Sequence, residues 1–115
     1  MSGRITRVNK HIQRVFGEIL HEEADLPTDV LVTISKVSTT PNLKSATIWL
    51  YISPSSKEEE VLERLKPQMY ELQGALNRSL EMRPLPRISL QADHGAQHAQ
   101  VIEQKLAEIK EDQEE

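Results

Sequence analysis

The segment from Val32 to Ile52 constrains the fold of this chain more than any other part of the sequence. It contains two stretches rich in β-branched residues, joined by a short turn built on Pro41 and Asn42, which predicts two strands in a hairpin. The second stretch alternates, so one of its faces is aliphatic. The residues on that face are Ala46, Ile48, Leu50 and Ile52. A sheet with one apolar face must bury it, and helical patterns flank the hairpin on both sides.

An amphipathic helix is predicted before the hairpin, from Arg4 to about Glu23. Its apolar residues recur at steps of three and four, namely Ile5, Val8, Ile12, Val15, Phe16, Ile19 and Leu20. Cations gather on or near a neighbouring face of the same helix, namely Arg4, Arg7, Lys10 and Arg14. Residues 1–16 contain no acidic residue at all, so we interpret this run as a functional basic face.

The second half of the chain predicts a helix interrupted at Pro67, a third strand and a final helix. Ser55 or Ser56 is the expected N-cap of the interrupted helix, because each has a glutamate three residues later. The third strand spans residues 87–92 and turns its alternate apolar residues inward. Asp93 is expected to cap the final helix, whose apolar positions are Ala96, Ala99, Ile102, Leu106 and Ile109.

This order of elements predicts one α+β domain over residues 1–109, with a three-stranded sheet and the helices on one face. Residues 110–115 form an acidic tail, expected to be a frayed, solvated end. The chain of 115 residues has no cysteine, which excludes disulfides, thiolate metal sites and cysteine nucleophiles. It has neither an apolar run near the ~20 residues of a membrane helix nor a signal-peptide core, so we expect a cytoplasmic protein.

The formal net charge of −4 conceals a segregation of charge along the sequence. The charged residues among the first sixteen are all cationic, whereas acidic residues cluster at residues 58–63 and at the C-terminus. A basic surface for nucleic acid is therefore compatible with an acidic total.

The order of these elements and the residues that fill them resemble the bacterial ribosome-binding factor A family, from about Arg4 to Ile109. Four segments carry the resemblance: Arg4–Val8 with Ile12, Ile19, Leu20 and Glu23; Val32–Val37 with Pro41–Ala46; Leu80 with Met82, Arg83 and Pro86; and Asp93. The family typically has an alanine-any-glycine kink between its two central helices. Those positions fall on Gln68 and Tyr70, where neither residue matches, and we interpret Pro67 as an alternative way of bending the chain.

The resemblance implies a type II KH-like fold that binds the immature small (30S) ribosomal subunit. It also implies a role in late folding and processing of 16S rRNA, without a cofactor and without catalysis. We expect a monomer whose partners are the small subunit and its rRNA, with no membrane and no small-molecule substrate. The candidate RNA-binding residues are Arg4, Arg7, Lys10, Arg14, Lys36, Lys44, Arg78, Arg83 and Arg87. The absence of any Gly-x-x-Gly motif favours recognition of RNA shape and phosphates over clamping of a single strand.

Two other interpretations stay open, a KH-like module for another structured RNA and a protein-interaction domain that uses the open sheet face. Trp49 and Tyr51 lie on that face, where covering the sheet or contacting the last helix is favoured over stacking on a base. His94 and His98 have the spacing of two metal ligands on a helix, but no further ligand is evident, so we expect no metal site. No strained nucleophile motif or phosphate-binding glycine run supports an enzyme.

Overall fold

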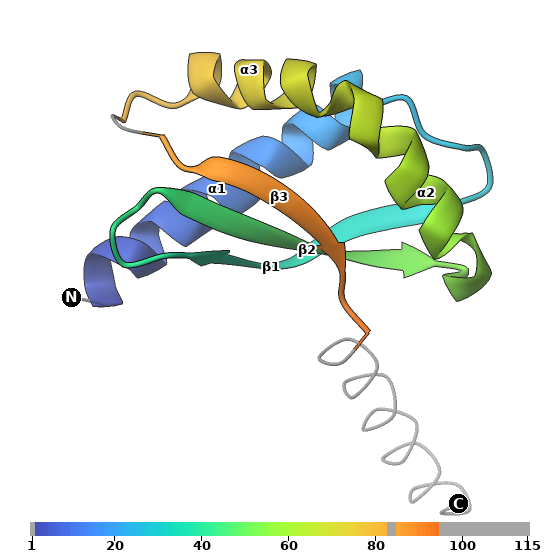
Figure 1. Ribbon diagram of the computed structural model, residues 1–115, viewed down its shortest axis with the longest axis horizontal. Helices are drawn as coiled ribbons and strands as arrows, with labels where there is room; N and C mark the ends of the chain where they lie inside the picture. Colours follow the sequence, from blue (N-terminus) through green and yellow to red (C-terminus); the bar gives the residue numbers. More distant parts are fainter. Residues whose placement is uncertain (1, 83–84, 95–115) are drawn as a thin grey trace, which may run out of the picture.

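The computed structural model describes residues 2–82 and 85–94, which form an α+β fold in the expected order (Figure 1). The elements are α1 (Ser2–Glu23), β1 (Leu31–Thr39), β2 (Ser45–Ser53), the 3-10 turn η1 (Ser55–Lys57), α2 (Glu58–Leu65), the 3-10 turn η2 (Lys66–Gln68), α3 (Met69–Ser79) and β3 (Arg87–Ala92). The expected final helix and the acidic tail at 110–115 lie outside the described residues. In the part of the chain that the structure describes, no helix is both long and apolar enough to cross a membrane.

The three strands form one mixed sheet in the order β1-β2-β3. β1 and β2 are antiparallel, with a bulge at Ser35 between Ile34 and Lys36, whereas β3 runs parallel to β2. Ser45 is paired with Arg87, so β3 begins beside the turn that joins β1 to β2. This register places two segments that are distant in the sequence at the same end of the sheet.

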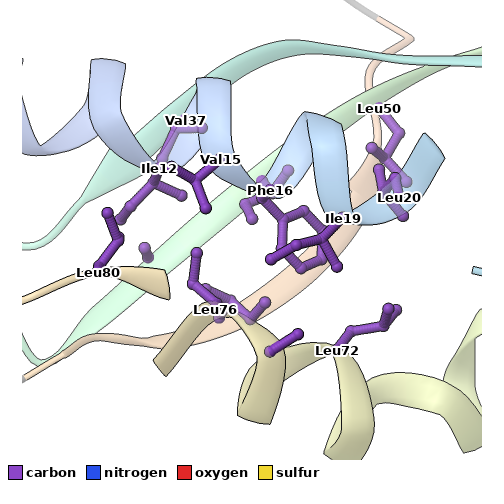
Figure 2. Close-up of a cluster of buried hydrophobic side chains, with 14 of the residues drawn as sticks. Ile12, Val15, Phe16, Ile19, Leu20, Val37, Leu50, Leu72, Leu76 and Leu80 are labelled. Carbon is purple, nitrogen blue, oxygen red and sulfur yellow. The ribbon is translucent and has the colours of Figure 1, made fainter. Parts of the chain in front are cut away.

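The core lies between one face of the sheet and the helices α1 and α3 (Figure 2). Burial alternates along β2 as the sequence predicts, with the four aliphatic residues of the expected face buried. The apolar stripe of α1 meets this face, and Ile12 and Phe16 have no exposed surface. Leu76 of α3 is equally buried. Since each helix turns its apolar stripe to the core, its polar side chains, including the cations of α1, face outward.

The break between α2 and α3 occurs at the 3-10 turn that contains Pro67, which confirms the predicted interruption. The side chain of Gln68 fixes this break to the segment that follows α1. Its Oε1 accepts a hydrogen bond from the Asp25 backbone N–H at 2.7 Å, and its Nε2 donates to the Asp25 carbonyl at 2.8 Å. Gln68 Nε2 also lies 2.9 Å from the carbonyl of Arg64, whose guanidinium is 3.3 Å from the Asp25 carboxylate. Gln68, one of the two residues that depart from the family pattern, therefore has a structural role.

The prediction that Ser55 or Ser56 caps the interrupted helix is wrong. Both residues belong to η1, and α2 begins at Glu58 with Lys57 in the N-cap position and no side-chain cap hydrogen bond. The reason is the tight turn after Pro54, whose carbonyl accepts the Lys57 N–H at 2.9 Å and satisfies that donor through the backbone. The three glutamates of the first turn still favour the helix through its dipole.

Replacing Leu76 with alanine is expected to lower the free energy of unfolding by about 2–5 kcal/mol, because this buried side chain faces α1 across the core. Tyr70→Ala in the same helix is the control, since Tyr70 is 89% exposed and its loss should change the free energy by less than about 0.5 kcal/mol. Urea denaturation followed by circular dichroism measures both changes. Equal denaturation midpoints for the two variants would contradict the position of Leu76.

Candidate nucleic-acid interface

Four segments meet at one end of the molecule: the start of α1, the β1–β2 turn, the end of α3 and the start of β3 (Figure 1). One hydrogen bond links α1 to the end of β1, and another links the start of β3 to the β1–β2 turn. Thr39 Oγ1 lies 2.5 Å from Asn9 Oδ1 of α1, and the Arg87 backbone N–H donates to the Lys44 carbonyl at 2.9 Å. Six of the predicted cations are exposed here, at what we call the basic end: Arg4, Arg7, Lys10, Lys44, Arg78 and Arg87.

Two of the other three predicted cations lie elsewhere, and the third is not described by the structure. Arg14 is farther along α1, where its Nη1 is 3.9 Å from Glu18 Oε2 in an exposed ion pair. Lys36 lies on the outer face of the sheet, the face turned away from the helices. Arg83 falls outside the described residues. The structure thus brings together the cations of four separate segments but leaves Arg14 and Lys36 at the margin.

The opposite end of the molecule is acidic. Its carboxylates come from the end of α1, the connection to β1 and the start of α2, namely Glu18, Glu22, Glu23, Asp25, Asp29, Glu58, Glu59, Glu60 and Glu63. The cations there are paired, for example Arg64 with Asp25 at 3.3 Å and Lys66 with Glu63 at 3.3 Å. Among the described residues, none of the six cations of the basic end is in an ion pair. They are therefore available for an anionic partner, and the charge separation orients the molecule toward one.

A groove of about 740 Å³ lies beside the basic end, between α3 and the start of β3. It is lined by Met69, Tyr70, Gln73, Asn77, Leu85, Arg87 and Ile88. Tyr70 is almost fully exposed there and offers an aromatic surface to a ligand. This groove was not predicted from the sequence, because Tyr70 and Gln73 lie beside the apolar stripe of α3 and carry no pattern of their own.

Gln73 holds the two walls of this groove together. Its Nε2 donates to the Pro86 carbonyl at 3.1 Å, and its Oε1 accepts the Ile88 backbone N–H at 2.9 Å. The side chain therefore brackets Arg87 from both sides of the chain. These two hydrogen bonds fix the position of Arg87 at the start of β3.

The outer face of the sheet carries Trp49, which is half-buried. Lys36 Nζ lies 5.2 Å from the centroid of its ring, a cation–π contact. At the end of β3 the buried Asp93 lies close by, with its Oδ2 2.6 Å from Ser35 Oγ of the bulge. The aromatic residue thus belongs to a structured surface of the sheet.

His94 does not pair with another histidine in the described part of the chain. Its Nε2 contacts Glu58 Oε1, which joins the end of β3 to the start of α2. His98, the other member of the considered metal pair, lies outside the described residues. Across residues 2–82 and 85–94, no group of three or more histidine or acidic side chains could hold a metal ion.

Comparison with known proteins agrees with the fold and with the sequence pattern. A family model described as "Ribosome-binding factor A" matches residues 4–106. A ribosome-binding factor A from Opitutus terrae is 32% identical over 110 residues, which cover 95% of this chain and 89% of the relative. The crystal structure of ribosome-binding factor A from Thermus thermophilus has a TM-score of 0.67 at 22% identity, covering 76% of this chain and 93% of that chain.

A second set of Thermus thermophilus coordinates is also similar in fold. It is a homology model of ribosome binding factor A fitted into a cryo-electron microscopy map of its complex with the 30S subunit. Its TM-score is 0.61 at 20% identity, covering 76% of this chain and 92% of that chain.

Replacing Gln73 with alanine should speed hydrogen exchange of the Ile88 amide by about tenfold or more, because the loss of this hydrogen bond lowers protection by about 1–2 kcal/mol. Gln73→Glu keeps the acceptor and should retain most of the protection. Gln91→Ala, an exposed change in the same strand, is the control. Unchanged Ile88 exchange in the alanine variant, measured by NMR, would show that the groove is held by other contacts.

Proposed function

This chain belongs to the ribosome-binding factor A family, and we propose that it is a cytoplasmic assembly factor that binds the immature small ribosomal subunit. In this role it assists the late folding and processing of 16S rRNA without catalysing a reaction. The observation that carries the proposal is the set of six exposed cations at the basic end, which have no ion-pair partner among the described residues. The Thermus thermophilus relative fitted into the map of a 30S complex supports the choice of partner.

The proposed mechanism is electrostatic docking followed by selection of one rRNA conformation. Each cation that neutralises a phosphate releases counterions, so binding weakens steeply as salt rises. An RNA arrangement that presents phosphates to several of these cations at once binds best, and the protein shifts the population toward it. No bond needs to be made or broken for this effect.

Five of the six cations of the basic end divide the proposed contact into two parts. Arg4, Arg7 and Lys10 follow the first half of α1 and would track a phosphate backbone along the helix. Lys44 and Arg87 lie on adjacent strand ends and would bind phosphates of a second RNA segment. Their separate locations suit a folded RNA better than a short single strand.

The groove between α3 and β3 adds an aromatic contact to this interface. Tyr70 on its rim would stack on one unpaired base, while Arg87 in the same groove holds the neighbouring phosphate. This arrangement uses no Gly-x-x-Gly loop. It would contribute affinity at one position of the RNA while the phosphate contacts position the protein.

Charge reversal tests the proposal directly. Arg4→Glu combined with Arg7→Glu should weaken binding to free small subunits at least tenfold. The plot of log binding constant against log salt concentration should also become less steep. Its negative slope should shrink in magnitude by about 0.7–0.9 for each phosphate that the variant no longer neutralises. The measurement is co-sedimentation with purified small subunits over a series of salt concentrations. Recovery of precursor 16S rRNA with the tagged protein from growing cells identifies the immature subunit as the partner.

The matched control carries the same change in charge at the acidic end, Lys57→Glu combined with Lys66→Glu. It should bind within about twofold of the unmodified protein, because exposed charges farther from a contact than the Debye length, about 10 Å at 0.1 M salt, are largely screened. Equal weakening by both pairs would mean that net charge, and not the basic end, determines binding. Equal affinity of the unmodified protein for unrelated structured RNAs would favour a general RNA-binding module instead.

A further inference from the structure

The first residues of β1 form a free edge of the sheet in the described part of the chain. The strand order β1-β2-β3 leaves β1 with one neighbouring strand. Farther along β1, α1 covers this edge, because Gln13 Nε2 donates to the Ile34 carbonyl at 3.4 Å. No described residue outside β2 hydrogen bonds to the backbone of Leu31–Thr33. An edge strand with unpaired N–H and C=O groups can accept an added strand.

A hollow of about 430 Å³ opens beside this edge, between the second half of α1 and the start of β1. Val32 is paired with the buried Ile52 and turns to the same inner face of the sheet, yet Val32 is only half-buried. The core is therefore incompletely covered at this point. The side chains that line the hollow are mainly apolar, namely Leu20, Ala24, Leu26, Val30, Leu31 and Val32.

Gly17 of α1 also lines the hollow and leaves it open. A glycine inside a helix is less favourable than an alanine, so a steric reason for this residue would be expected. The described chain supplies none, since the nearest atom that a Cβ of residue 17 would meet is Ile34 Cδ1 at an ordinary contact distance of 3.8 Å. The glycine therefore provides space that the described residues do not fill.

The surroundings of the hollow are acidic. Residues 15–35 contain no lysine or arginine and five exposed carboxylates, namely Glu18, Glu22, Glu23, Asp25 and Asp29. Two of the five are in ion pairs, with Arg14 and Arg64, whereas the other three have no ion-pair partner among the described residues. This charge repels the phosphates of RNA and the same end of a second copy of the chain. It attracts a segment rich in lysine and arginine.

We propose that the start of β1 and the hollow beside it bind an extended, basic segment of a partner protein. The segment pairs with Leu31–Thr33 as an added strand about 4.8 Å from β1. It places one apolar side chain in the hollow, next to Gly17 and Val32, and its lysine and arginine side chains near the surrounding carboxylates. The main-chain hydrogen bonds give affinity, while the hollow and its charge select the sequence.

This surface is separate from the basic end. The connection from α1 to β1 lies at the end of the molecule opposite the β1–β2 turn that carries Lys44 (Figure 1). The protein can therefore hold RNA phosphates at one end and a basic protein segment at the other at the same time. The inference goes beyond the proposed function and does not depend on it.

A synthetic peptide tests the chemistry of the partner on the full chain. The probe is Arg-Lys-Val-Arg-Ile-Lys-Arg with blocked ends, whose two apolar residues lie on one face of a strand. We expect it to bind and to shift the NMR amide signals of Gly17, Leu31 and Val32. An analogue with serine at both apolar positions should bind about tenfold more weakly or less, and so should an analogue with glutamate at the five cationic positions. Equal affinity of either analogue, or signal shifts confined to other acidic segments, would overturn the proposal.

Backbone methylation of the probe tests the strand pairing. Successive residues of a strand direct their N–H groups to opposite edges, so only alternate residues of the peptide donate to β1. Two analogues are compared, one N-methylated at the even positions and the other at the odd positions. One should lose binding, and the other should keep the affinity of the probe within about threefold, because its methyl groups lie on the outer edge. Equal affinity of the two analogues would overturn the proposal.

Two glycines of α1 give a matched pair of variants. Gly17→Leu fills the hollow and should weaken binding of the probe by about tenfold or more. Gly3→Leu is the control, because Gly3 is exposed, has no described atom within 4 Å of an added Cβ, and should bind the probe within about twofold of the unmodified protein. Equal affinity of the two variants, each shown to be folded by circular dichroism, would overturn the proposal. The NMR signal shifts locate the probe on the unmodified protein, so they decide even if Gly17→Leu does not fold.

A second copy of the chain is the alternative occupant of this edge. Sedimentation equilibrium without peptide should show a monomer over the concentrations used for NMR. A dimer whose formation shifts the amide signals of Leu31 and Val32 would overturn the proposal, because the surface would then be an interface between copies.

Discussion

The burial of one face of the sheet beneath α1 and α3 is the interaction on which the rest of this structure depends. It fixes the rotation of α1, because Ile12 and Phe16 must turn inward and the cations on the other side of the helix must then turn outward. It also fixes the register of the strands, since a shift by one residue would expose the aliphatic face of β2. The packing of the apolar core thus determines where the charged side chains lie on the surface.

The sequence was sufficient for those parts of the fold that follow from local periodicity. α1 and the strand Arg87–Ala92 could be predicted closely, since each has a continuous pattern of buried positions. Pro67 marks the break between α2 and α3, because its ring is incompatible with a helix interior. The serine caps were wrong because a capping motif does not reveal whether the first turn is an α-helix or a 3-10 turn. Here the backbone of Pro54 determined the outcome.

The candidate site could be predicted only as a set of residue types. The cations of α1 are visible as a run without acids, but their meeting with Lys44 and Arg87 depends on the parallel register of β3, which no local pattern encodes. The groove beside Tyr70 was missed for the same reason, because its walls are distant in the sequence and are joined by one side chain, Gln73. The periodicity of a sequence does not reveal which distant segments pair with one another.

The parallel pairing of β3 with β2 has a consequence for the folding of the chain. A parallel crossover closes a long loop before it gains any contact, so β3 is expected to join the sheet after the β1–β2 hairpin has formed. Until that step, the hairpin turn with Lys44 has no neighbour at Arg87, and the groove has only one wall. A chain still emerging from its own synthesis therefore presents only part of this surface. The complete surface forms last, in the fully folded molecule.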